Sequence, residues 1–360
     1  MTRAWVEIDL DALCRNGAAV AARAGVPLLP MVKADGYGLG GLRAALALDR
    51  LDPWGFGVAT VHEGDELRRG GITRPVIVFT PILRNEIDAL RRGDLTPALG
   101  DPAVIESWAR TGRPWHLQID TGMSRAGMQW DLVAEHRALL TRARPNGVFT
   151  HFHSAELDDA SRGEQEQRFD QALAALPDVP TLVHAENGPA VERRAPSRWS
   201  VCRPGIFLYG VAGFEGGAIA PDPVVSMRAR IVELRTIRDG ESVSYDATWR
   251  ASGTRRIATV PVGYADGYQR SLSNRGEALL AGRRIAVTGR VTMDMTMFDV
   301  TDTDADLGDV VTLLGRQGDD VVTVSEMATR AGLSPYEILT GLRLRLPRRY
   351  AEGAREVVAA

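Results

Sequence analysis

Short apolar runs recur over the first 225 residues and alternate with amphipathic stretches. Eight runs occur, at 28–34, 55–60, 75–80, 96–100, 115–120, 147–152, 181–186 and 206–210. The stretches 83–92 and 131–144 between them carry apolar residues at helical spacing. Parallel strands that are buried on both faces have such continuous apolar runs. Eight strands that alternate with helices predict a (β/α)8 barrel over residues 1–225.

An open, doubly wound sheet is the alternative arrangement of the same strands and helices. That fold would carry a glycine-rich turn after the first strand, with glycines spaced for close approach to a dinucleotide. The segment 33–40, Lys-Ala-Asp-Gly-Tyr-Gly-Leu-Gly, has its glycines in a different register. The barrel is therefore the preferred interpretation.

The pattern changes near residue 225 to the alternation of apolar and polar positions that is typical of half-buried strands. Such alternation occurs at 224–237, 256–262, 284–291 and 309–314. Farther on, Ser334-Pro335-Tyr336-Glu337 combines a capping-box spacing with a proline at the first helical position, which predicts a short helix. We therefore expect a mainly β second domain over residues 226–360, packed closely against the barrel.

Charge and cysteine content exclude several classes of protein. The formal net charge is -3 and the arginines and acids are interspersed, so no basic face for nucleic acid is expected. No apolar run approaches the length of a membrane span, and two acids interrupt the only early apolar stretch, so we expect a cytoplasmic protein without a membrane partner. Cys14 and Cys202 are too few for a disulfide framework or a thiolate metal site, and no metal is expected.

Lysine usage points to a reactive amine. The chain has 43 lysines and arginines together, and only Lys33 is a lysine. Arginine can replace lysine as a surface cation, but it cannot form a Schiff base with an aldehyde. Codon bias could also remove lysine, in which case Lys33 would lie anywhere on the surface. The barrel instead places Lys33 at the carboxyl end of its first strand, where barrel active sites are built.

Other reactive side chains lie at the ends of later predicted strands. They are Asp120, Arg125, His151, His153, Asn187 and Arg203. Each of these residues alone is more often structural than functional. Their shared location at one end of the barrel predicts a common site there.

Six motifs occur in the same order as in a known enzyme family. They are Pro-Met-Val-Lys-Ala-Asp-Gly-Tyr-Gly at 30–38, Ile-Asp-Thr-Gly-Met-Ser-Arg at 119–125, Thr-His-Phe at 150–152, Arg-Pro-Gly-Ile-Phe-Leu-Tyr-Gly at 203–210, Val-Gly-Tyr-Ala-Asp-Gly at 262–267 and Gly-Arg-Val-Thr-Met-Asp at 289–294. In these motifs the chain resembles the alanine racemases over nearly its whole length. The resemblance implies a pyridoxal-phosphate enzyme with an N-terminal barrel, a C-terminal β domain and a homodimer whose active sites combine both chains.

The resemblance also implies two bases for the interconversion of L- and D-alanine. Pyridoxal phosphate supplies an electron sink that makes the proton on Cα removable. Inversion then needs an acid or base on each face of that carbon. Lys33 matches the residue that binds the cofactor and acts on one face. Tyr264 of the partner subunit matches the base on the other face.

The remaining site residues are assigned by the same resemblance. His151 would hydrogen-bond Tyr264 of the partner subunit, and Arg203 would meet the pyridine nitrogen of the cofactor. A permanent cation at that nitrogen should oppose its protonation and so suppress side reactions. Carboxylate contacts are expected from the Arg125 side chain and the Met293 N–H, and phosphate contacts from Tyr37, Gly205 and Ile206.

Three positions depart from the family pattern. Gln118 stands where most members have a carbamylated lysine that braces the arginine matched by Arg125, so the brace should be weaker. Gly188 replaces a common phosphate-binding serine, which affects the expected cofactor affinity. Leu344 replaces a tyrosine expected near the substrate, which leaves the preferred amino acid open.

Other activities remain open at this point. A racemase of broader specificity, including serine, has the same fold. A decarboxylase of this fold would use a cysteine acid in the second domain, and no cysteine follows Cys202. A noncatalytic pyridoxal-phosphate protein would lack the β domain and Tyr264. The physiological role, D-alanine biosynthesis for a peptidoglycan precursor or catabolism, is also open.

Overall fold

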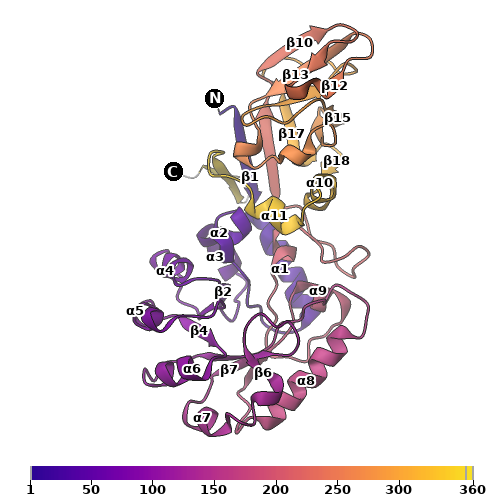
Figure 1. The fold of residues 1–360 in the computed structure, drawn as a ribbon. Helices are drawn as coiled ribbons and strands as arrows, with labels where there is room; N and C mark the ends of the chain where they lie inside the picture. Colours follow the sequence, from indigo (N-terminus) through magenta and orange to yellow (C-terminus); the bar gives the residue numbers. More distant parts are fainter. Residues whose placement is uncertain (1, 353–354, 359–360) are drawn as a thin grey trace.

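The computed structural model describes residues 2–352 and 355–358, and they form two parts (Figure 1). The lower part in this view is a ring of parallel strands with helices around it. The upper part is mainly β, and the last strands of the chain lie beside the first one. The predicted barrel followed by a mainly β domain is therefore confirmed.

The barrel consists of short strands with helices between them. Its strands pair in parallel in the order β2-β3-β4-β5-β7-β8, with β6 beside β5. The elements are α1 (Leu10–Ala24), α2 (Lys33–Gly38), α3 (Gly41–Asp49), β2 (Phe56–Val58), α4 (Val61–Arg69), β3 (Val76–Val78), η1 (Arg84–Glu86), α5 (Ile87–Arg92), β4 (Thr96–Leu99), α6 (Pro102–Ala109), β5 (His116–Asp120), β6 (Met128–Gln129), η2 (Trp130–Leu132), α7 (Arg137–Arg142), β7 (Gly147–Phe149), α8 (Ser161–Ala175), β8 (Leu182–His184), α9 (Gly188–Arg193) and η3 (Ile206–Tyr209).

Isolated bridges close the ring where full strands were expected. Met31 pairs with Gly57 of β2, Leu28 pairs with Cys202, and Asn187 pairs with Arg203. The first predicted run, 28–34, therefore occupies its place in the barrel without forming a regular strand. Its extended part ends at Val32, and α2 begins at Lys33.

The predicted strand at 206–210 is wrong. These residues form the 3₁₀ helix η3, and the chain takes the last barrel position earlier, at 202–203. A short apolar run has no periodicity that separates a strand from a buried helical turn. Gly210 ends the helix with a positive φ of 90°, a conformation that glycine adopts without steric cost.

The second part is built around one long sheet. Its strands pair in the order β10-β13-β16-β15-β14-β17-β9-β1-β19-β20, with β18 beside β17. Its elements are β1 (Ala4–Asp9), β9 (Val225–Arg230), β10 (Glu233–Ile237), β11 (Ser242–Val243), η4 (Tyr245–Ala247), β12 (Trp249–Arg250), β13 (Arg255–Val260), η5 (Tyr264–Asp266), η6 (Arg270–Leu272), β14 (Glu277–Leu280), β15 (Arg283–Val287), β16 (Thr296–Asp299), β17 (Val310–Gln317), β18 (Asp320–Val322), α10 (Val324–Ala331), α11 (Pro335–Thr340), β19 (Arg348–Glu352) and β20 (Arg355–Val358).

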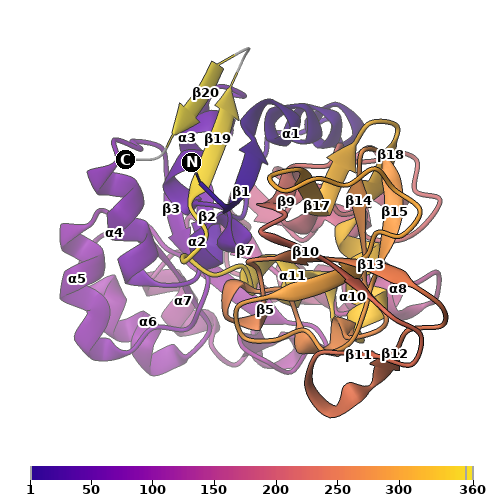
Figure 2. The same cartoon turned by 90° about the horizontal axis from the view of Figure 1, so that it is seen from above.

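Both ends of the chain contribute to this sheet. Strand β1 pairs antiparallel with β9 and parallel with β19 (Figure 2). The chain thus begins in the second part, crosses into the barrel through α1, and returns at β9. The domain boundary near residue 225 stays a prediction.

The predicted helix after Ser334 is confirmed as α11. Ser334 and Glu337 form the capping box, and proline stands in the first turn. Helix α11 lies where the second part meets the barrel, and its Tyr336 ring faces Tyr37 of α2 at 6.0 Å between centroids. One hydrophobic core cluster includes residues of both parts, so the two parts pack together directly.

Candidate active site

A cavity of about 280 Å³ brings together seven of the predicted site residues. Residues from the barrel strands, the turns that follow them and α11 form its wall. The predicted residues among them are Lys33, Tyr37, Arg125, His151, Arg203, Gly205 and Ile206. A larger cavity of about 500 Å³ lies beside α1 and β1 and contains none of these residues.

Lys33 begins a turn with an unusual backbone. The φ angles of Ala34, Asp35, Gly36 and Tyr37 are 53°, 53°, 60° and 57°, so the turn is left-handed. Each non-glycine residue in this region costs roughly 1–2 kcal/mol, so the turn needs support from outside. Glu63 of α4 supplies it, since its Oε1 accepts from the Ala34 N–H at 2.7 Å. Sequence reasoning missed Glu63, because nothing near it in the sequence indicates the left-handed turn.

The amine of Lys33 loses its proton more easily than a free lysine does. Burial lowers its pKa, the positive charge of Arg125 lowers it further, and Glu63 opposes both effects. A cavity wall that carries a lysine with a lowered pKa can supply a neutral amine. A neutral amine is both a nucleophile and a base.

Arg203 is a buried cation at the floor of the cavity. It donates to the carbonyls of Thr150 at 2.8 Å and Ala185 at 3.0 Å. No carboxylate among residues 2–352 forms an ion pair with it. Burial lowers the pKa of Arg203 to about 10, so the guanidinium remains charged at neutral pH. The site thus contains a fixed positive charge that no described carboxylate contacts as an ion pair, although Glu186 lies near enough to influence it.

The histidines around Arg203 have defined protonation states. Arg203 reaches Nδ1 of His184 at 2.8 Å and Nδ1 of His151 at 3.3 Å. A guanidinium can only donate, so both Nδ1 atoms accept and both protons lie on Nε2. His184 then donates from Nε2 to Nδ1 of His116 at 3.0 Å. Burial and the nearby Arg203 lower the pKa of His151 to about 3, so this ring is neutral and presents its Nε2–H as a donor.

Tyr37 and Gly205 meet at another wall of the cavity. The Tyr37 ring stacks on Tyr209 with 4.6 Å between centroids, and Tyr209 in turn donates to the carbonyl of Met31 at 3.0 Å. A Cβ atom on Gly205 would lie only 2.3 Å from the Tyr37 hydroxyl. The glycine is therefore required for that hydroxyl to occupy its place. Gly205 is the N-cap residue of η3 and Ile206 is its first residue, and the first N–H groups of a helix have no partner within it.

Gln118 lines the cavity but does not brace Arg125 as expected. Its Nε2 donates to the carbonyl of Ala126 at 3.1 Å, one residue beyond Arg125. No hydrogen bond between Gln118 and Arg125 occurs in the described part of the chain. Gln118 therefore holds the backbone next to Arg125 and leaves the guanidinium free to meet a ligand.

Tyr264 and Met293 do not line this cavity. Both lie in the second part, where they are 39% and 52% exposed. Their loops are adjacent, because Tyr264 N–H donates to the Thr292 carbonyl at 3.0 Å and Ala265 N–H donates to the Met293 carbonyl at 3.0 Å. Within a single chain, then, the two predicted bases are not brought together.

Leu344 does not line the cavity of its own chain, and its predicted place beside the substrate stays a prediction. Its side chain is 81% exposed. Tyr336 of α11 lines the cavity instead, and sequence reasoning treated this residue only as part of a helix start. Gly188 lines the cavity as expected, and a Cβ there would meet Phe207 at an ordinary 3.5 Å.

Three other predicted strand-end residues have structural roles. Asp120 accepts from the N–H groups of Gly122 and Ser124, both at 3.0 Å. His153 bonds to the hydroxyl of the adjacent Ser154 at 2.7 Å. Asn187 lines the cavity and also caps α9. No group of acids, histidines and cysteines suited to a metal occurs among residues 2–352 and 355–358.

Comparison with known proteins places both parts of the chain in one family. The family model described as "Alanine racemase, N-terminal domain" matches residues 8–213, and "Alanine racemase, C-terminal domain" matches residues 224–350. The chain belongs to the alanine racemase family. An alanine racemase from Geobacter sp. is 39% identical over 368 residues, which cover 96% of this chain and 97% of that protein. One from Deinococcus radiodurans is 39% identical over 354 residues, covering 97% and 99%.

Solved structures of the family have the same fold. Alanine racemase from Bacillus anthracis with bound L-Ala-P has a TM-score of 0.91 at 29% identity and covers 99% of this chain and 97% of that one. The enzyme from Bartonella henselae with covalently bound pyridoxal phosphate has a TM-score of 0.90 at 26% identity, with coverage of 98% and 100%. Within residues 2–352 and 355–358, no helix is both long and apolar enough for a membrane span.

Proposed function

We propose that this chain interconverts L- and D-alanine with pyridoxal phosphate. The observation that carries the proposal is the place of Lys33, the only lysine of the sequence, in the wall of the cavity that also holds Arg125, His151 and Arg203. When bound, pyridoxal phosphate withdraws electrons from Cα and makes its proton removable. The chain's own residues must then bind the cofactor, orient the substrate and move that proton.

The cavity wall fits the cofactor group by group. Lys33 offers an amine with a lowered pKa for the aldehyde. The Tyr37 hydroxyl and the first N–H groups of η3 form a cradle for a phosphate, and a side chain on Gly205 would fill that cradle. Arg203 supplies a cation for the pyridine nitrogen, and Arg125 supplies a planar donor for the phenol oxygen and the substrate carboxylate.

Arg203 makes racemisation the favoured outcome. Its guanidinium is charged at neutral pH and has no acidic partner in the described chain, so it opposes protonation of a ring nitrogen beside it. With the cofactor bound, this position of Arg203 would favour return of the proton to Cα over side reactions. An aminotransferase or decarboxylase would gain from an acid at the same place.

Tyr264 and Met293 act in the site of a partner subunit. Both side chains are exposed in their own chain, and neither lines its own cavity. His151 supports this assignment, because its neutral ring presents an Nε2–H that can donate to the oxygen of an incoming phenol. Such a bond would hold the Tyr264 oxygen in place in the partner's site. The functional unit is then a homodimer with two shared sites.

The proposal also covers the place of the enzyme in metabolism. The family resemblance links D-alanine to the synthesis of a peptidoglycan precursor in the cytoplasm. The family models and the curated relatives support alanine as the substrate. A broader range that includes serine stays open, because Leu344 is exposed in its own chain and its place relative to the substrate is not tested.

Subunit mixing tests the two bases and the shared site together. Lys33→Ala and Tyr264→Phe should each be inactive as homodimers. After subunit exchange, a mixed dimer has one site with both bases and one site with neither. Half of the dimers are mixed and half of their sites are whole, so activity should recover to about one quarter of the wild-type value.

The matched control mixes Lys33→Ala with the double variant Lys33→Ala/Tyr264→Phe. No site in that mixture contains Lys33, so activity should stay absent. Mass spectrometry of differently tagged subunits shows that exchange has occurred. Absence of recovery in the first mixture despite exchange would contradict a Tyr264 that acts across subunits.

A further inference from the structure

Arg345 joins the two loops of the second part that carry Tyr264 and Met293. Its Nε and Nη2 donate to the two carboxylate oxygens of Asp266, at 2.6 and 2.7 Å. Its Nη1 donates to Asp294 at 2.6 Å. Asp266 ends the 3₁₀ turn that begins at Tyr264, and Asp294 directly follows Met293. One guanidinium therefore binds both loops.

The two loops are also in direct backbone contact. Asp266 is only 1% exposed, and its Oδ2 accepts from the Gly263 N–H at 2.9 Å, which closes the turn. A Cβ on Gly263 would lie 2.2 Å from the Thr292 carbonyl oxygen, so glycine is needed for this approach. Arg345 holds this contact from the outside by binding an acid from each loop.

The side chain of Tyr264 depends on this backbone for its position. At 39% exposure it is not enclosed by its own chain. When no core surrounds a side chain, its position depends mainly on the backbone to which it is attached. A shift of the turn would therefore move the Tyr264 hydroxyl by a similar amount. An error of about 1 Å at a reacting group can cost on the order of 10²-fold in rate.

We propose that Arg345 is a positioning residue that sets Tyr264 and Met293 as one unit for the partner's site. The inference rests on the proposed function, in which Tyr264 is the second base. Arg345 does not touch the substrate and acts only through Asp266 and Asp294. The two loops then approach the partner's site with a fixed spacing between the phenol and the Met293 N–H.

These contacts with Asp266 and Asp294 require an arginine at position 345 rather than any cation. The planar guanidinium places three donors at once, two on Asp266 and one on Asp294. A lysine at this position keeps the charge but offers a single nitrogen, which cannot reproduce the two-point contact with Asp266. Arg345→Lys should therefore give a smaller defect than Arg345→Met in the same direction.

The test measures proton exchange on each face of the substrate separately. Exchange of the Cα hydrogen for solvent deuterium in one enantiomer needs only the base that faces it, whereas racemisation needs both bases. In Arg345→Met, racemisation should fall by on the order of 10²-fold. Exchange should fall for one enantiomer only, the one whose exchange is lost in Tyr264→Phe. Cofactor content and dimer mass should equal those of the wild type.

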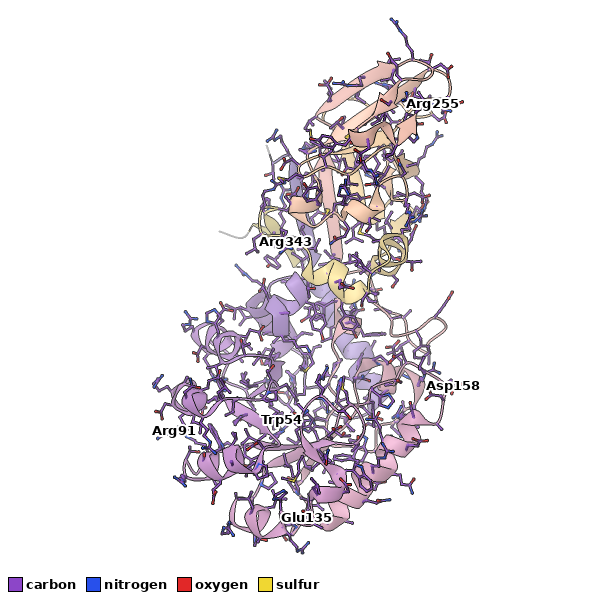
Figure 3. All side chains as sticks on the ribbon, viewed as in Figure 1. Trp54, Arg91, Glu135, Asp158, Arg255 and Arg343 are labelled. Atoms are coloured by element: carbon purple, nitrogen blue, oxygen red, sulfur yellow. The ribbon has the colours of Figure 1, made fainter. Side chains whose placement is uncertain are left out.

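The neighbouring Arg343 provides the matched control. It is exposed at the junction of the two parts (Figure 3), and its side chain makes no hydrogen bond or ion pair with another described residue. Arg343→Met should leave both exchange rates and racemisation unchanged. A comparable one-sided loss in this control would assign the effect to the loss of any nearby charge and overturn the role of Arg345.

The outcomes separate this inference from the proposed function. If Tyr264→Phe leaves exchange of both enantiomers intact, the assignment of the second base fails, and the inference fails with it. If Tyr264→Phe shows the one-sided loss but the Arg345 variants lose both exchange rates equally, or neither, only the inference fails. A one-sided loss in Arg345→Met, smaller in Arg345→Lys, supports it.

Discussion

Replacing Gly205 by alanine should displace one hydroxyl group and weaken cofactor binding. The new Cβ would lie 2.3 Å from the Tyr37 oxygen, whereas ordinary contacts begin at about 3.5 Å. The hydroxyl would have to move by about 1 Å.

Tyr37 has little freedom to retreat without losing its place in the phosphate cradle. Its ring is stacked on the fully buried Tyr209 and is itself only 6% exposed. Overpacking of this kind costs roughly 1–3 kcal/mol of stability. The lost hydrogen bond between the Tyr37 hydroxyl and the charged phosphate would contribute about 1.5–3 kcal/mol to cofactor binding. Cofactor affinity should therefore fall by about 10- to 150-fold.

Titration of apoprotein with pyridoxal phosphate, followed by fluorescence quenching, measures this change. Gly163→Ala in α8 is the control, because an added Cβ there meets nothing within 4 Å, and its affinity should equal that of the wild type. Tyr37→Phe removes the hydroxyl without overpacking and should give a similar loss of affinity. If Gly205→Ala weakens binding as strongly in the Tyr37→Phe background as in the wild type, the effect does not act through the hydroxyl and the reasoning is refuted.

Three further predictions concern single groups. Borohydride reduction of the holoenzyme should attach one pyridoxyl group per chain, at Lys33, and a peptide map that finds the label elsewhere would refute this. Added bicarbonate at constant pH should not stimulate activity, because Gln118 cannot be carbamylated; clear stimulation would contradict the role given to Gln118. Burial raises the pKa of the Glu192 carboxyl from 4.5 to about 7, although a hydrogen bond from the Gly213 N–H acts in the opposite direction and lowers it. The folded state therefore holds this proton more tightly than the unfolded state, and wild-type stability should fall relative to Glu192→Gln as pH rises from about 4.5 to about 7. Urea unfolding across that range measures the difference, and parallel curves for the two proteins would show that the carboxyl is not buried.

Burial on both faces is what made the barrel strands predictable. The runs at 55–60 and 75–80 are continuous and apolar because helices cover one side of the ring and side chains fill the other. The run at 206–210 is equally apolar, but it forms a buried 3₁₀ turn. Apolar content alone therefore could not distinguish a buried strand from a buried turn. The strand 4–9 was not predicted, because its partners are more than 200 residues away in the sequence.

Residues of the cavity could be predicted where the sequence carries a distinctive signal, either the single lysine or a family motif. Lys33 stands out because no other lysine competes with it. Tyr336 and Glu63 gave no such signal, since each reaches the site through the packing of its helix, α11 or α4, against α2. A match by sequence neighbourhood also does not show which side of the chain faces the cavity, so the place of Leu344 beside the substrate stays a prediction.

The pairing of β1 with β9 and β19 has a consequence for synthesis on the ribosome. Strand β1 emerges from the ribosome before either of its neighbours, which begin only at residues 225 and 348. The barrel can fold while this strand still has two open edges, and unpaired edges promote aggregation in nascent chains. A translation pause after the barrel would prolong that exposure. Chaperones that bind strand β1 should therefore matter more for this chain than for a protein whose domains follow one another along the sequence.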